Sequence, residues 1–203
     1  MRSILLLGVV VSVVIGFAIG RLSAQEAAAS CRRCPSTYIP ASEIAEFTAF
    51  GRADLSLIDQ QMRAIDIGKS RVDVALVHRG KLDKLGGRSV AEHDLVSEVY
   101  YILSGSGTNR TGPDLVDPKP RPATDRTVRL LNGPGGDASD IRNAAEHELK
   151  AGDVLVIPAG TGHQFTKIDD HITYLMVRID PDKVVPLMDE AASQAYRAAH
   201  RQK

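Results

Sequence analysis

Residues 152–167, with the sequence GDVLVIPAGTGHQFTK, contain two short β-rich runs around a corner of proline and glycine. The first run, residues 153–157, ends at Pro158, and the second, residues 163–167, begins with His163. Glycine and proline at strand ends permit the tight corners that a small antiparallel barrel requires. This stretch therefore predicts two short strands joined by a tight turn, with a histidine at the start of the second.

Residues 87–105, with the sequence GRSVAEHDLVSEVYYILSG, precede that stretch and place His93 and Glu98 before a run of aromatic and aliphatic residues. An unpaired charge is costly to bury, so a buried Glu98 needs compensation, and a metal ion would provide it. The alternative is an exposed glutamate at the start of a strand. A single histidine in an apolar strand is more often a packed core residue than a ligand. A ligand role is therefore predicted for His93 and His163 only when the two are considered together.

Further β-rich runs flank these two stretches, and glycine or proline separates them without helical periodicity. They are residues 61–67, 72–78, 98–103, 128–131 and 172–179. This pattern predicts an all-β barrel or sandwich. Apolar residues at helical spacing predict helices over residues 40–52 and beyond residue 182.

A proline-rich segment, residues 107–127, interrupts the pattern with four prolines. Proline cannot donate to a β-ladder, so we expect a long loop or an excursion at the edge of the sheet. Loops of this length are often lids or binding loops, and a solvated insertion is the alternative.

Taken together, the two quoted stretches resemble the two signature motifs of the cupin superfamily. Gly152, Pro158, Gly160 and His163 fit the second motif, with Lys167 at the position of its final asparagine. His93, Glu98 and Gly105 fit the first motif, with Ala91 at the position of its first histidine. The resemblance covers about residues 60–180 and implies an all-β fold: a single cupin (double-stranded β-helix or jelly-roll) antiparallel barrel with short flanking helices.

The resemblance also implies a metal site formed by His93, Glu98 and His163. Two histidines and one carboxylate leave coordination positions open, as in non-haem Fe(II) sites, and they also suit Mn, Ni or Zn. Ala91 removes one ligand from the four-ligand cupin site, and Glu92 beside it would point the other way on a strand. Weakened or lost metal binding is therefore the alternative.

Strand alternation identifies two neighbours of these ligands as predicted substrate-binding residues. Tyr100 shares a face with Glu98, and Phe165 shares a face with His163; plain core packing is the alternative for Tyr100. The other histidines of the body have polar neighbours, so we expect the following at the surface: His78, His147 and His171.

The first 24 residues have the three parts of a secretory signal peptide. Residues 4–19 form an uncharged apolar run, Arg2 precedes it, and small residues stand at positions 23 and 24. The alternative is a retained N-terminal membrane anchor; in both cases the remainder is expected outside the cytoplasm, periplasmic or secreted. A leader with Cys31 and Cys34 follows at residues 25–59, then the barrel at residues 60–180 and a C-terminal helix or tail at residues 181–203. A local disulfide or an intermolecular bridge fits this cysteine pair better than a redox or zinc site, because the chain has no other cysteine.

The composition narrows the class of function. The 203 residues carry 25 Lys and Arg against 25 Asp and Glu, a balance that argues against nucleic-acid binding. Two functions remain. One is a metal-dependent enzyme, a dioxygenase, isomerase or lyase, acting on a small molecule. The other is a non-enzymatic cupin module that binds a small ligand, since fold does not decide function. The resemblance further implies a homodimer formed through barrel faces, with membrane contact only through an uncleaved N-terminal segment.

Overall fold

The computed structural model describes residues 29–201, so the expected signal peptide at residues 1–24 lies outside the described residues. Cys31 and Cys34 form a disulfide with each other, which is the local pairing expected for them. Within residues 29–201, no helix is long and apolar enough to cross a membrane. Export and the homodimer stay predictions.

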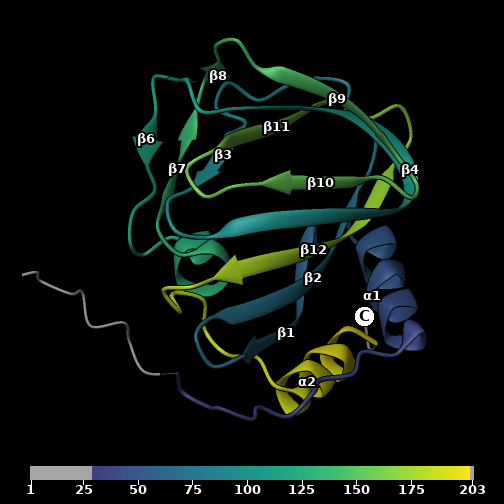
Figure 1. Ribbon diagram of the computed structural model, residues 1–203. Helices are drawn as coiled ribbons and strands as arrows, with labels where there is room; N and C mark the ends of the chain where they lie inside the picture. The colour runs from purple at the N-terminus through teal and green to yellow at the C-terminus, as the bar shows by residue number, and fades with distance from the viewer. Residues whose placement is uncertain (1–28, 202–203) are drawn as a thin grey trace, which may run out of the picture.

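Residues 29–201 form an antiparallel β-barrel flanked by two α-helices, and this confirms the predicted fold class (Figure 1). All strand pairs are antiparallel, and the main path runs β1-β2-β12-β4-β11-β3-β7-β6, with β9 and β10 also paired to β4. The strands are β1 (Asp59–Asp66), β2 (Arg71–Arg79), β3 (Val90–His93), β4 (Ser97–Gly112), β5 (Leu115–Val116), β6 (Lys119–Pro120), β7 (Gly135–Ala138), β8 (Asp140–Ile141), β9 (Ala145–Lys150), β10 (Val154–Ile157), β11 (Gly162–Lys167) and β12 (Ile172–Asp180).

Strand β4 connects the two halves of the barrel. Its first half pairs with β12 and β10, and its second half pairs with β11 and β9. The sequence predicts that this strand stops at Gly105, which is wrong. Gly105 instead has a φ of 74°, and a side chain there would overlap the carbonyl oxygen of His171, so the glycine lets the strand bend and continue. The predicted loop at residues 107–127 therefore begins as strand.

The interior between the two halves is filled by apolar side chains from both. Burial of this surface is the main favourable contribution to folding. The largest cluster draws on β2, β4, β9, β10, β11 and β12, and includes Ala75, Val77, Tyr100, Ile102, Leu149, Leu155, Ile157, Phe165, Tyr174 and Met176.

Two helices cover the outer face of β1 and β2, where Phe47 packs on Met62 and Leu76. They are α1 (Ala41–Ala53), which agrees with the predicted residues 40–52, and α2 (Glu190–Arg201), which begins later than the predicted start at residue 182. On this side His78 is buried and its Nδ1 lies 2.7 Å from the hydroxyl of Thr173, so its predicted surface position is wrong. The cause is α1, whose Gly51 lies against His78.

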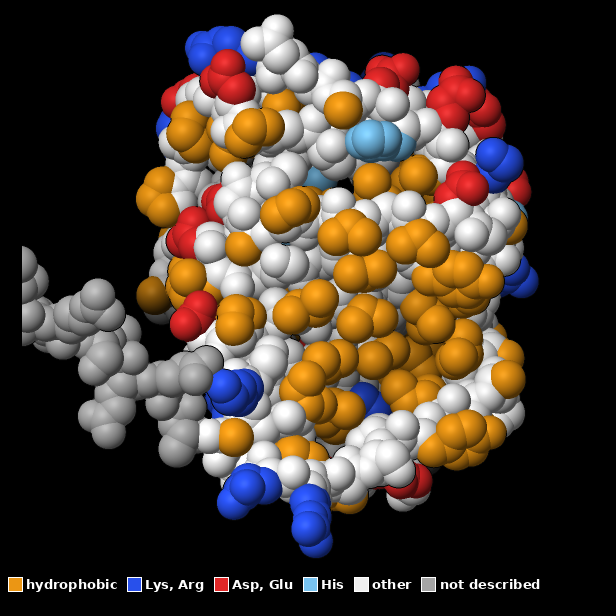
Figure 2. All heavy atoms as spheres, in the orientation of Figure 1, with side chains coloured by type: hydrophobic (Ala, Val, Ile, Leu, Met, Phe, Trp, Pro, Cys, Tyr) orange, Lys and Arg blue, Asp and Glu red, His pale blue; other side chains and the backbone are white. Residues whose placement is uncertain are grey.

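The outer face of β10 and its neighbours is apolar and exposed (Figure 2). Val154 and Val156 are 59% and 61% exposed, and Tyr101 on the adjoining strand β4 is 47% exposed. Exposed apolar patches commonly mark interaction sites. The predicted homodimer therefore has an apolar face available to it.

A buried ion pair attaches α1 to the barrel. Arg63 of β1 donates to both carboxylate oxygens of Glu43, at 2.6 and 3.1 Å, and Ser193 of α2 donates to the same carboxylate at 3.1 Å. Both charged side chains are almost fully buried.

We predict that Glu43→Ala lowers the free energy of unfolding by about 3–5 kcal/mol, because Arg63 would stay buried without its counter-charge. Glu46→Ala is the control: Glu46 is partly exposed and pairs with Arg201 and Arg197, and we expect a smaller loss, of about 1 kcal/mol. Urea unfolding followed by circular dichroism measures both. Equal losses in the two variants would contradict the prediction.

Candidate metal centre and its cavity

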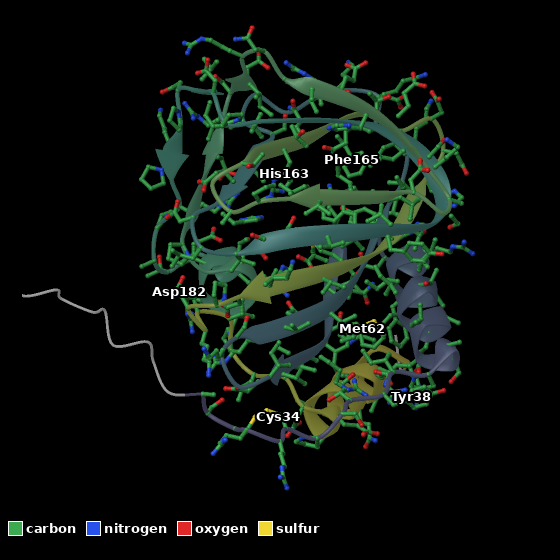
Figure 3. The ribbon with its side chains drawn as sticks, viewed as in Figure 1. Cys34, Tyr38, Met62, His163, Phe165 and Asp182 are labelled. Carbon is green, nitrogen blue, oxygen red and sulfur yellow. A yellow bond between two sulfur atoms is a disulfide. The ribbon has the colours of Figure 1, made fainter. Side chains whose placement is uncertain are left out.

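The three predicted ligands meet inside the barrel. His93 ends β3, Glu98 lies near the start of β4, and His163 lies near the start of β11, where Figure 3 labels it with Phe165 along the same strand. Glu98 Oε1 is 3.3 Å from Nε2 of His93, and Glu98 Oε2 is 3.5 Å from Nε2 of His163. All three side chains are buried, and their candidate ligand atoms lie within 4.8 Å of one another. These distances suit three donors around one cation.

The protonation states of the cluster favour a cation. Burial alone would raise the pKa of Glu98, but the positive charge of neighbouring groups outweighs it and holds this pKa well below its usual range. Burial lowers the pKa of His163 to about 4, against a smaller opposing effect of Glu98. At neutral pH the cluster therefore presents an ionised carboxylate and an uncharged imidazole with a free lone pair.

The counter-charge for Glu98 within the protein is shared. Arg178 of β12 lies 3.6 Å from Glu98, but it also binds Asp73 at 2.6 Å and pairs with Asp59. Burial raises the pKa of Asp73 to about 6, although Arg178 opposes this shift. Three carboxylates thus share one guanidinium group. Together these four side chains carry an excess of negative charge at neutral pH.

A cavity of about 510 Å³ opens against the three side chains. Its lining includes Ala91, the residue directly opposite His163 across the β3–β11 pair. The methyl group of Ala91 leaves space where a longer side chain would stand. The cluster therefore faces a volume large enough for a small molecule.

Arg79 adds a positive charge without a salt-bridge partner to the wall of this cavity. Its Nε lies 3.4 Å from the hydroxyl of Tyr174, and its guanidinium carbon lies 5.5 Å from the centre of the Phe165 ring. Among residues 29–201, no carboxylate forms a salt bridge with Arg79. Asp59, whose charge acts on it, is already paired with Arg178.

The two predicted substrate-binding residues lie beside the cluster in different ways. Tyr100 lines the cavity, but its hydroxyl donates to Glu98 Oε2 at 2.7 Å and is thus engaged with a candidate ligand. Phe165 lines a smaller neighbouring cavity of about 140 Å³ and lies beneath Arg79. Their role toward a substrate stays a prediction.

Asn132 is a part of the site that the sequence analysis misses. Residues 128–131 were predicted as a strand, and this is wrong: Val128–Asn132 forms one π-helical turn, η1. The turn ends at Gly133, whose φ of 66° permits the sharp exit that a strand assignment overlooks. The amide nitrogen of Asn132 lies 2.7 Å from Nε2 of His93 and 3.2 Å from its Nδ1. Nothing in the local sequence indicates this contact, because the two residues are 39 positions apart.

The chain is similar to several known proteins over part of its length. A family model described as an AraC-like ligand-binding domain matches residues 142–202. A solved structure from Bacillus halodurans is 15% identical, with a TM-score of 0.42, over 79% of this chain and 96% of that one. A cupin protein from Bacteroides fragilis is 19% identical over 58% and 72% of the two chains, with a TM-score of 0.31.

An RmlC-like cupin with a double-stranded β-helix fold from Methanocaldococcus jannaschii is 10% identical over 62% of this chain and 84% of that one, with a TM-score of 0.36. No curated protein matches the chain. The chain is thus similar to an AraC-like ligand-binding domain over residues 142–202 and, at low identity, to these cupin structures.

We predict that the imidazole of His163 titrates with a midpoint near pH 4 in the metal-free protein, well below the ordinary 6.5. Since the folded pKa is lower than the unfolded one, the neutral ring contributes stability that is present above about pH 6.5 and is lost as the pH falls through 4. NMR titration of the ring Cε1 proton measures this, with His163→Gln identifying the resonance. A midpoint near 6.5 would contradict the burial argument.

Proposed function

We propose that this protein is a metal-binding cupin and a metal-dependent enzyme, a dioxygenase, isomerase or lyase, that acts on a small anionic molecule outside the cytoplasm. The observation that carries the proposal is the buried convergence of His93, Glu98 and His163 on one cavity. A divalent Fe, Mn, Ni or Zn ion suits this donor set.

The residues present fit such an ion. Two imidazoles and one carboxylate, all buried, are the donor types that these metals bind. The three carboxylates around Arg178 leave negative charge that a divalent cation would offset. When bound, the metal would supply a Lewis acid or a site for O₂.

Residues around the proposed metal site hold its ligands in place and limit the access of water to it. Tyr100 donates to Oε2 of Glu98 and Arg178 lies beside Oε1, so both carboxylate oxygens are held in place. The apolar side chains of β2 and β12, such as Val77 and Met176, line the cavity and limit the access of water. A water-poor site strengthens electrostatic interactions within it.

The charge of Arg79 indicates which chemical class of substrate the cavity would bind. A partly buried guanidinium that stacks on Phe165 and lacks a carboxylate partner is suited to bind an anionic group of a ligand. Arg79 and His93 line the same cavity, so a carboxylate held by Arg79 would keep the rest of a small molecule close to the candidate ligands. A small carboxylate is the substrate that best complements the positive charge of Arg79 on the cavity wall.

The alternative function is a non-enzymatic module that binds a small ligand in the barrel. The match of residues 142–202 to an AraC-like ligand-binding domain favours it. Ala91 also favours it, because a barrel that lacks one of the four cupin metal ligands can still bind a small molecule without catalysing a reaction. Binding of a ligand without turnover in a metal-free barrel would decide for this alternative.

Metal content is the first test of the enzyme proposal. We expect about one divalent metal ion per wild-type chain after incubation with Fe, Mn, Ni or Zn, and a large loss in His93→Ala and in His163→Ala. His147→Ala is the control, because His147 lies on β9 and its Nε2 contacts Thr111 instead. Elemental analysis measures all four proteins. A folded wild-type protein that takes up none of these metals would exclude the metalloenzyme.

Arg79 is tested with two ligands of nearly the same size and shape, of which one is an anion and the other is neutral. We predict that benzoate raises the melting temperature of the metal-loaded protein more than benzamide does, and that Arg79→Gln weakens the binding of benzoate about ten- to hundredfold. Arg129→Gln is the control, since Arg129 is exposed on η1. Thermal shift and calorimetric titration measure the effect. Equal stabilisation by the acid and the amide would argue against an anionic substrate.

A further inference from the structure

We propose that Asn132 supplies a fourth ligand, through its side-chain carbonyl oxygen, to the metal held by His93, Glu98 and His163. This inference rests on the proposed metal site and adds a residue that neither cupin-type motif contains. The added donor comes from η1, on the proline-rich side of the barrel, and not from a barrel strand.

The side chain of Asn132 is buried, and of its two polar atoms only the amide nitrogen has a hydrogen-bond partner within residues 29–201. It is 5% exposed, and its amide nitrogen lies 2.7 Å from Nε2 of His93. Its oxygen is buried and has no hydrogen-bond partner among residues 29–201. A buried carbonyl group without a partner is costly, so this oxygen requires an explanation.

A bound metal would reverse the side chain's orientation. The oxygen and nitrogen of a carboxamide are nearly the same size, and a half-turn of the group exchanges them. Nε2 of His93 cannot accept a hydrogen bond from Asn132 once its lone pair is given to a metal. The half-turn then removes the amide donor from that nitrogen and brings the unpartnered oxygen to the place where a cation shared with His93 would lie.

The cavity has room for this added donor because Ala91 is small. Ala91 and Asn132 line the same cavity, and the methyl group of Ala91 offers no ligand atom on the strand opposite His163. An amide oxygen is a neutral, hard donor, so it completes the coordination without adding charge. The added oxygen donor makes the site harder, which suits Mn²⁺ or Fe²⁺ better than the three-ligand set alone does.

The competing explanation is that Asn132 only orients His93 by a hydrogen bond. Co²⁺ distinguishes the two roles, because it binds to nitrogen and oxygen donors and can be located in a crystal. In Co²⁺-loaded wild-type protein we expect the Asn132 oxygen at a bonding distance of about 2.0–2.2 Å from the metal. A bound Co²⁺ with this oxygen more than about 3 Å away would overturn the proposal.

Affinity gives a second, independent measurement on the full chain. By calorimetric titration with Co²⁺, we expect Asn132→Ala to bind at least about tenfold more weakly than wild type, which is about 1.4 kcal/mol. Asn132→Asp should retain or increase the affinity, since it keeps an oxygen at the same place. Asn109→Ala is the control, because Asn109 is a buried asparagine on β4 that does not line the cavity.

The outcomes separate this proposal from the one on which it rests. If folded wild type binds no Co²⁺, the metal site itself is excluded, and the role of Asn132 with it. If wild type and Asn132→Ala bind Co²⁺ equally well, the metal site stands and the fourth ligand is excluded. If Asn132→Ala does not fold, the metal–oxygen distance in the wild-type crystal decides alone.

Discussion

The buried charge of Glu98 is the constraint on which the site depends. Glu98 is 2% exposed, and its carboxylate lies 3.3 Å from His93, 3.5 Å from His163 and 3.6 Å from Arg178. An ionised carboxylate in an apolar interior is stable only where partners replace the water it has lost. The hydroxyl of Tyr100 and the guanidinium of Arg178 do so in part, and the two imidazoles face the remaining space.

The course of β4 brings these partners together. Glu98 lies in the half of the strand that pairs with β12, directly opposite Arg178 in the register, whereas the two histidines lie on β3 and β11, which pair with each other. The cluster therefore joins both halves of the barrel across the interior. The bend at Gly105 makes this possible, because it lets one strand belong to both halves.

Spacing along the chain predicts some of this site, and pairing across the barrel supplies the rest. The resemblance to the two cupin motifs predicts His93, Glu98 and His163 as ligands, and strand alternation then places Tyr100 on the same face as Glu98. Arg79, Asn132 and Arg178 were missed, since their partners are far away in sequence and depend on strand register. Residues 128–131 are a short, mostly aliphatic run that predicts a strand, but they form a π-helical turn that ends at Gly133.

The excess of carboxylates around Arg178 also favours the proposed metal site over an ordinary ion-pair network. A network that serves stability alone would balance its charges, because each unmatched buried charge lowers stability. Here Asp59, Asp73 and Glu98 share one guanidinium, while Arg79 in the same cavity pairs with none of them. Negative charge is thus kept at the ligand cluster and positive charge on the cavity wall. A divalent cation bound at the ligand cluster and an anionic ligand bound at the cavity wall would together balance these charges.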